Sequence, residues 1–345
     1  MSPITTTIII SSLATSTIIT STSHHWLMAW IGLEMNTLSI LPIISKQHHP
    51  RATEAATKYF LTQSAASALI LFSSTINAWK LGTWDITQMM DPTSNILLTS
   101  ALAMKLGLVP MHFWLPEVLQ GSTMKTALII STWQKLAPMA LMYITANNLS
   151  PIILILMGTL SAMVGGWGGL NQTQTRKIMA YSSIAHLGWM ATISTIMTNI
   201  MLMNLMIYII MTTSMFYMLI TSKSKTIQDT TTSWTSSPTT TIMMMLTLLS
   251  LGGLPPLTGF LPKWLILEEL TMQNLTTTAT MMALASLLSL FFYLRIAYTT
   301  TLTTAPNTTT TKHKWRFKPT PPTTPISLTI PFTLWLLPMT PLILM

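Results

Sequence analysis

The sequence contains no cysteine among its 345 residues. That absence excludes disulfide frameworks, thiolate metal sites, thiolate-ligated iron–sulfur clusters and cysteine nucleophiles. Charged residues are also scarce, because they make up 7% of the chain, whereas soluble domains contain roughly a quarter. So few charges cannot cover a water-facing surface. The sequence is therefore not that of a soluble globular protein.

Long apolar runs are what the sequence does have. Half of its residues are hydrophobic, and runs of about 20 residues recur, enough for a helix to cross the ~30 Å hydrocarbon core of a bilayer. The sequence therefore predicts an all-α polytopic membrane protein with about eleven transmembrane helices. We place their centres near residues 12, 34, 68, 105, 134, 160, 187, 210, 252, 286 and 335.

The positions of the basic residues support this count. Short loops on the inner side of a membrane collect Lys and Arg. Of the 17 basic residues, 13 follow even-numbered spans, whereas Lys80 alone follows an odd-numbered span. The amino terminus is therefore predicted on the positive side of the membrane, with the carboxyl terminus opposite. The net charge of +9 indicates topology and not nucleic-acid binding.

An internal repeat relates two Gly- and Pro-containing segments. Leu106–Pro110 and Leu251–Pro255 lie 145 residues apart, and the Leu-Pro pairs that begin at Leu115 and Leu261 lie 146 apart. The segments fall in the fourth and ninth spans, and a separation of five helices reverses the direction of crossing. We expect one transmembrane domain, 1–345, with two inverted five-helix repeats, a basic loop and a last helix. Their predicted boundaries are 1–146, 150–298, 299–324 and 325–345.

Pro110, Pro255 and Pro256 are predicted to break these two helices in mid-membrane. Each Pro lacks an N–H and frees the carbonyl four residues earlier. Freed backbone groups are tolerated in a membrane only against protein or a water-filled cavity. Paired broken helices therefore indicate an ion or substrate path near the midplane. The alternative is a pair of kinks that serve packing.

Four charged residues are predicted inside the spans: Glu34, Lys105, Lys135 and Lys263. A charge at the bilayer centre costs at least ~2.5–3.5 kcal/mol, so these groups need partners or water. Burial disfavours the charged form of each, and a neighbouring opposite charge favours it. Such a row can hold or pass a proton, which predicts a proton relay. The alternative is a structural ion pair between Glu34 and one lysine.

Other candidates are weaker. His186, inside the seventh span, is a further relay residue or a hydrogen-bonded packing residue. His112 follows the first break and is expected near an aqueous entry. Glu268 and Glu269 are either a proton exit or a solvated helix end. The glycines in 165–169 lack the spacing and the preceding strand of a dinucleotide site, and the sequence shows no flavin, quinone or metal ligand set.

Several motifs resemble those of one family. They are Trp30–Asn36, Lys105–Glu117, Asn171–Trp189 and Leu251–Lys263. In these segments, and over essentially its whole length, the chain resembles the antiporter-like NADH dehydrogenase subunit 2 family of mitochondrial respiratory complex I. The resemblance implies a multi-pass subunit of the mitochondrial inner membrane, with its amino terminus on the matrix side and its carboxyl terminus on the intermembrane-space side.

The resemblance also implies partners and residue roles. The partners would be other membrane-arm subunits, accessory subunits and lipids, while NADH, FMN, iron–sulfur clusters and ubiquinone would bind in partner subunits. Glu34 is similar to the family's helix-paired glutamate, and Lys105, Lys135 and Lys263 to its lysines. The expected function is proton translocation coupled to electron transfer. A cation/proton antiporter and an inactive structural subunit are the alternatives.

Overall fold

The chain is described by a computed structural model, which covers residues 2–47, 49–302 and 324–339. In these residues the regular structure is helical, with two isolated antiparallel bridges and no strand. The predicted all-α class is therefore correct. The chain divides into two compact units, the first made of residues 1–161 and 187–198 and the second of 162–186 and 199–345.

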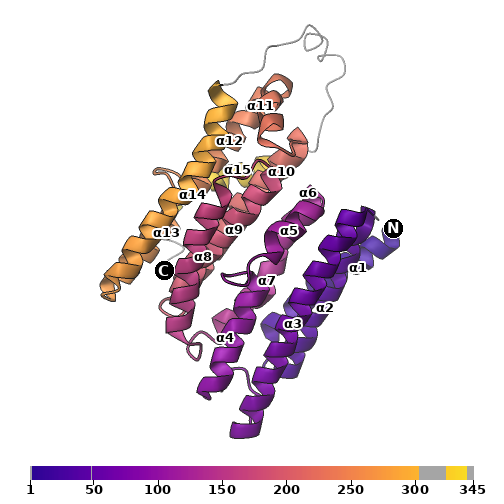
Figure 1. Cartoon of the computed structure of the whole chain (residues 1–345), viewed down its shortest axis with the longest axis vertical. Helices are drawn as coiled ribbons and strands as arrows, with labels where there is room; N and C mark the ends of the chain where they lie inside the picture. The colour runs from indigo at the N-terminus through magenta and orange to yellow at the C-terminus, as the bar shows by residue number, and fades with distance from the viewer. Residues whose placement is uncertain (1, 48, 303–323, 340–345) are drawn as a thin grey trace. The chain divides into compact units, whose positions relative to one another are not determined.

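The first unit contains the helices of the amino-terminal half (Figure 1). They are α1 (Pro3–Thr22), α2 (Trp26–Ile44), α3 (Pro50–Leu81), α4 (Pro92–Leu106), α5 (Trp114–Gly121), α6 (Met124–Ser131) and α7 (Trp133–Ile144), with a 3-10 turn at Ser45–Gln47. Pro opens several of them, because its missing N–H would be unpaired at a helix start anyway. Asp91 caps α4 by accepting a hydrogen bond from the backbone of Ser94 at 3.1 Å.

Asp91 also joins the ends of α3 and α4. Its carboxylate accepts a hydrogen bond from the Lys80 amine at 2.8 Å and another from the Thr93 hydroxyl. These two bonds, the one from Lys80 foremost, lower the pKa of Asp91 to about 2. The loop of residues 82–91 is thus fixed at both of its ends, and Lys80, the exception to the charge pattern, has a local partner.

The second unit contains most of the carboxyl-terminal half. Two helices have residues in both units: α8 (Pro151–Gly169) and α9 (Thr175–Ile193). The others are α10 (Thr198–Ser222), α11 (Ile227–Ser236), α12 (Pro238–Gly252), α13 (Phe260–Met272), α14 (Thr276–Leu302) and α15 (Thr324–Trp335), followed by a 3-10 turn at Leu337–Met339. The predicted basic loop lies mostly outside the described residues, as does the end of the last predicted helix.

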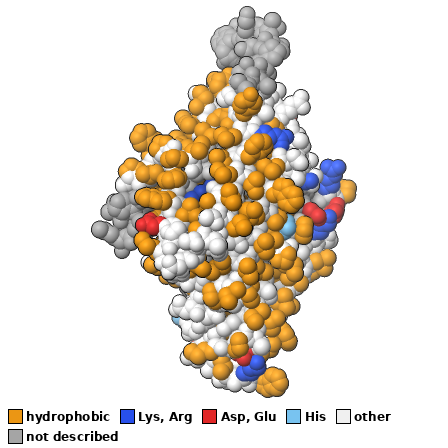
Figure 2. Space-filling view, turned by 60° about the vertical axis from the view of Figure 1, so that its left-hand side comes forward, with side chains coloured by type: hydrophobic (Ala, Val, Ile, Leu, Met, Phe, Trp, Pro, Cys, Tyr) orange, Lys and Arg blue, Asp and Glu red, His pale blue; other side chains and the backbone are white. Residues whose placement is uncertain are grey.

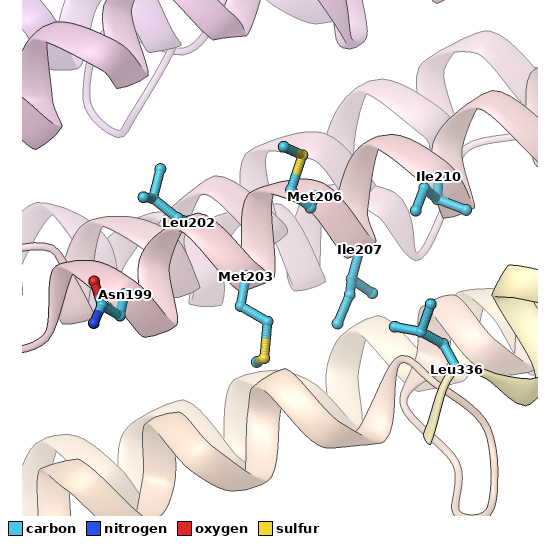
Figure 3. Close-up of a pocket in the computed structure, with 7 residues that line it drawn as sticks. All are labelled: Asn199, Leu202, Met203, Met206, Ile207, Ile210 and Leu336. Atoms are coloured by element: carbon cyan, nitrogen blue, oxygen red, sulfur yellow. The ribbon is translucent and has the colours of Figure 1, made fainter. Parts of the chain in front are cut away.

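Six described helices are long and apolar enough to cross a membrane: α1, α2, α3, α8, α10 and α14. Breaks divide several other predicted spans into shorter helices, namely α4 with α5, α6 with α7, and α12 with α13. Hydrophobic side chains dominate the face shown in Figure 2, where charged side chains occupy a few small areas. Ser and Thr inside the helices donate to carbonyls one turn earlier, as Ser16 does to Leu13 at 2.8 Å.

Candidate functional site

The first broken helix ends at Leu106, where Gly107 adopts a left-handed conformation with φ +81°. This conformation lets the N–H of Gly107 reach the carbonyls of Ala103 and Met104, as expected for a glycine after a helix end. The indole N–H of Trp114 donates to the same Met104 carbonyl at 3.2 Å. The break is therefore a closed, hydrogen-bonded turn.

Side chains from two other helices reach the last carbonyls of α4. Gln63 of α3 donates to the carbonyl of Lys105 at 3.5 Å. The amine of Lys135, from α7, donates to the carbonyl of Leu106 at 2.5 Å and lies 5.2 Å from the centroid of the Trp114 ring. Lys135 is 1% exposed. Its ammonium thus lies at the negative end of a helix and near an aromatic ring, and both stabilise a cation.

Lys105 differs from Lys135 in its partners. Lys105 is 3% exposed, and among the residues that the structure describes its amine has no hydrogen-bond partner. Glu34 accepts hydrogen bonds from the Ser67 hydroxyl and, at 3.1 Å, from the Thr37 hydroxyl. Within the described residues, Glu34 and Lys105 do not form an ion pair within 4 Å. In this part of the chain the Glu34 carboxylate is thus bound by hydroxyls, and the Lys105 amine is a separate buried group.

A polar bridge crosses the first unit beside Lys135. The hydroxyl of Tyr59 donates to Gln134 at 3.1 Å, and the amide of Gln134 donates to Asn36 at 3.0 Å. The three side chains come from α3, α7 and α2, and all are buried. Sequence reasoning gave these side chains no role. The sequence did contain a signal for them, because a side-chain amide inside an apolar span needs a hydrogen-bond partner.

The second broken helix repeats the arrangement in the second unit. Its C-terminal residue is Gly252, and Gly253 is left-handed with φ +78°. The amine of Lys263 donates to the carbonyl of Gly252 at 2.7 Å. A Cβ added at Gly253 would lie 2.9 Å from the Lys263 amine, and one at Gly259 would lie 1.7 Å from the Ser250 carbonyl. Close approach of a backbone atom requires glycine at Gly259, whereas at Gly253 the left-handed backbone favours glycine and the nearby Lys263 side chain can move.

The two breaks share a geometry that their sequences disguise. The left-handed glycines, Gly107 and Gly253, lie 146 residues apart. The one extra residue of the second segment therefore comes before its left-handed turn and not after it. Lys135 comes from a later helix of its half, whereas Lys263 comes from the helix directly after the break. Lysines from helices at different positions in the two halves thus reach equivalent carbonyls. Each carbonyl belongs to the residue just before a left-handed glycine.

His186 lies in the second unit and is 6% exposed. Its ring centroid is 5.5 Å from that of Tyr208, and the imidazole interacts with the backbone of Leu251 and with the charge of Lys263. The structure therefore brings His186 to the second break. His112 is buried, with Nδ1 3.3 Å from the Pro110 carbonyl.

The predicted breaking prolines lie in the turns between the broken halves. Pro110 lies between α4 and α5, and Pro255 and Pro256 lie between α12 and α13. The bonds Val109–Pro110 and Pro255–Pro256 are cis. Glu268 and Glu269 lie within α13. The described residues contain no group of three or more His, Asp or Glu placed to hold a metal ion.

Known proteins identify this arrangement. Residues 23–289 match the family described as NADH:quinone oxidoreductase/Mrp antiporter, TM, and residues 290–344 match NADH dehydrogenase subunit 2 C-terminus. The chain is 56% identical over 341 residues to NADH-ubiquinone oxidoreductase chain 2 of Varanus nebulosus, with 99% of each chain covered. The chain belongs to the NADH dehydrogenase subunit 2 family. The family predicted from the sequence is thus confirmed.

Other members of the subunit 2 family and solved structures agree. The chain 2 protein of Squalus acanthias is 54% identical and covers 100% of this chain and 99% of its own. A chain of respiratory complex I from Thermus thermophilus superposes with a TM-score of 0.86 at 25% identity, covering 97% of this chain and 78% of that chain. A chain of the Mrp complex from Dietzia sp. shares the fold, with a TM-score of 0.83 at 15% identity, 97% of this chain and 75% of that one.

Proposed function

We propose that this chain translocates protons along a row of buried Glu and Lys residues, as a membrane-arm subunit of respiratory complex I, the NADH:ubiquinone oxidoreductase. Family membership and the likeness to a respiratory complex I chain support this role. Electron transfer takes place in other subunits, which hold NADH, FMN, iron–sulfur clusters and ubiquinone. This chain supplies the proton path.

The observation that carries the proposal is the placement of two lysine amines, of buried Lys135 and of half-buried Lys263, at the ends of two broken helices. A helix C-terminus stabilises a cation, so the charged forms of Lys135 and Lys263 each have a fixed site. The amine of Lys105 has no such acceptor in the described part of the chain. Neighbouring amines therefore differ in how well the protein stabilises their charge, and a proton moving among them changes the local field.

The proposed relay runs from Glu34 through Lys105 and Lys135, with His186 as a further carrier, to Lys263. A change at Glu34 would alter the charge balance at Lys105 and pass along the row. The polar bridge of Tyr59, Gln134 and Asn36 supports this role, because it holds the helix turn that bears Lys135.

The proposal includes a topology. The chain crosses the mitochondrial inner membrane about eleven times, as two inverted repeats at 1–146 and 150–298 followed by a last helix. The amino terminus lies on the matrix side and the carboxyl terminus on the intermembrane-space side. The matched left-handed glycines support the repeat, and the segregation of basic residues supports the orientation.

The test replaces Lys135 in the complete complex by Gln or Met and measures protons moved per electron in sealed vesicles. Gln keeps an N–H donor for the Leu106 carbonyl but carries no proton, whereas Met leaves that buried carbonyl unpaired, which costs ~1–3 kcal/mol of stability. We expect both variants to lower the proton-to-electron ratio and only Met to lower thermal stability. Lys105→Met is expected to lower the ratio too.

Lys80→Gln is the matched control, because it removes a lysine that pairs with Asp91 at the edge of the first unit. It should leave the ratio unchanged. A full ratio in Lys135→Gln and Lys105→Met would refute the relay and favour a structural role. Sodium-dependent transport without NADH would instead favour a cation/proton exchanger.

A further inference from the structure

Two loops of the second unit are joined into one surface. They are residues 170–174, between α8 and α9, and residues 223–226, between α10 and α11. An antiparallel bridge links Gln174 and Thr226. The backbone N–H and the side-chain hydroxyl of Thr175 each donate to the carbonyl of Lys225, both at 3.1 Å. Thr175 itself is buried, at 3% exposure, and Lys225 is exposed, so the pairing ties an exposed loop to the buried start of α9.

The joined loops gather positive charge. Arg176 and Lys177 follow the first loop directly, and Lys223 and Lys225 belong to the second. Lys177, Lys223 and Lys225 form no ion pair within 4 Å in the part of the chain that the structure describes. Asp229 lies nearby on α11, but its carboxylate accepts hydrogen bonds from the backbones of Lys225 and Thr226, both at 2.9 Å.

Lys223 has an unfavourable backbone conformation. It follows the last residue of α10 and is left-handed, with φ +54°. That position after a helix normally belongs to Gly or Asn, because a Cβ there meets the neighbouring carbonyl. A lysine is therefore a poor choice for the turn itself. Its charge explains its presence better than its conformation does.

The depth of these loops indicates what the charge binds. α8 and α10, which end here, are long and apolar enough to cross a membrane, so their ends lie where hydrocarbon gives way to lipid headgroups. Phosphates are the anions at that depth. We propose that Arg176, Lys177, Lys223 and Lys225 form a binding surface for the phosphate headgroups of anionic phospholipids.

This surface is separate from the proton relay. α11 leads away from it and packs against α12 and α14 (Figure 1), and α12 ends at the second break. A bound headgroup would brace the turn at the start of α11. A general orienting role of basic loops would need charge on this side but would not need the pairing of these two loops.

The test uses the complete complex in phosphatidylcholine vesicles that contain a photoactivatable phosphatidylglycerol, and measures its crosslinking to this chain. A juxtamembrane basic residue near an anionic surface contributes about a fivefold gain in binding. The double variant Lys223→Gly with Lys225→Gln should therefore crosslink about 25-fold less. Lys223→Gly also relieves the left-handed backbone, so the loss cannot be assigned to misfolding of this turn.

Lys80→Gln, which removes the same charge from a residue already paired with Asp91, should crosslink like the unsubstituted complex. The single variant Lys223→Arg, which keeps the positive charge and the native Lys225, should crosslink like the unsubstituted complex. Equal lipid crosslinking by the double variant would overturn the proposal. A chemical crosslink between Lys225 and an acidic segment of a partner subunit would overturn it as well. Unchanged crosslinking when the probe is zwitterionic phosphatidylcholine, which has no net charge, is the expected baseline for every variant.

Discussion

A lysine amine at the end of a broken helix meets two needs at once. The carbonyls of Leu106 and Gly252 would otherwise be unpaired in a medium without water, and an ammonium there lies at the negative end of the helix. Lys135 and Lys263 meet both needs. The same contact that satisfies the backbone therefore holds a group that can carry a proton.

At this residue scale, Gly253→Ala tests whether the position of Lys263 matters. An alanine there has a strained φ and a Cβ 2.9 Å from the Lys263 amine. Gly82 has the same kind of backbone, with φ +75°, but nothing lies within 4 Å of its missing Cβ. We expect each variant to lose ~1–2 kcal/mol from left-handed strain. Only Gly253→Ala should also lower the proton-to-electron ratio.

The measurements are thermal unfolding of the complex and proton pumping in sealed vesicles. If Gly82→Ala lowered the ratio as much as Gly253→Ala, backbone strain and not displacement of Lys263 would be the cause.

Helices in this protein are divided at places where another element needs the backbone. The first and second breaks expose carbonyls to lysines, and α6 gives way to α7 at Thr132, three residues before Lys135. The glycines of α8 serve packing instead. A Cβ at Gly168 would lie 2.4 Å from the ring of Tyr181 on α9, and one at Gly169 would lie 2.8 Å from Phe292 on α14. The glycine run that does not fit a dinucleotide site therefore lets α9 and α14 approach α8 closely.

At the scale of the element, Gly259→Ala should open the second break. Its new Cβ would lie 1.7 Å from the Ser250 carbonyl, a backbone atom that cannot rotate away. We expect a loss of stability above the ~1–3 kcal/mol typical of overpacking. Phe113 stands 146 residues earlier, at the corresponding place in the first break, and is 69% exposed.

Phe113→Ala is thus the matched change at the other break and should alter the melting temperature little. Calorimetry or thermal inactivation of the assembled complex compares the two. A melting temperature unchanged by Gly259→Ala would show that the turn before α13 yields, and that its tight packing is not needed.

At the scale of the whole molecule, the charged side chains of the described residues are few and lie mainly near the ends of helices. The predicted topology can be tested because the chain has no cysteine of its own. Single cysteines at the exposed positions Met90 and Gln273 should react with a membrane-impermeant maleimide from one side of the membrane. Cysteines at Thr173 and Gln228 should react from the other side, because loops after even-numbered spans and loops after odd-numbered spans lie on opposite faces of the membrane.

Labelling is measured on this chain in sealed vesicles of both orientations, with detergent-opened vesicles as the control for reactivity. Reaction of Met90→Cys and Gln273→Cys from opposite sides would require an odd number of crossings between them and would contradict the inverted repeats.

Much of this protein could be predicted from its sequence because the membrane restricts what a sequence can mean. Apolar runs identify helices, scarce charges inside them identify candidate sites, and Pro with Gly identifies breaks. The all-α fold and the family followed from these signals. The register of the two breaks did not: aligned by letters, Gly107 corresponds to Gly252, whereas the left-handed residue of the second break is Gly253.

The sequence by itself determined the class, the family and which charges stand inside apolar runs, because a bilayer tolerates so few alternatives. Only the tertiary structure decided which atoms those charges meet. It assigned the Lys135 and Lys263 amines to helix-end carbonyls, left the Lys105 amine without an acceptor, and joined the loops that gather Lys223 and Lys225. The reason is physical: helical periodicity shows that a residue is in a span, but the partner of a side chain depends on how distant helices pack.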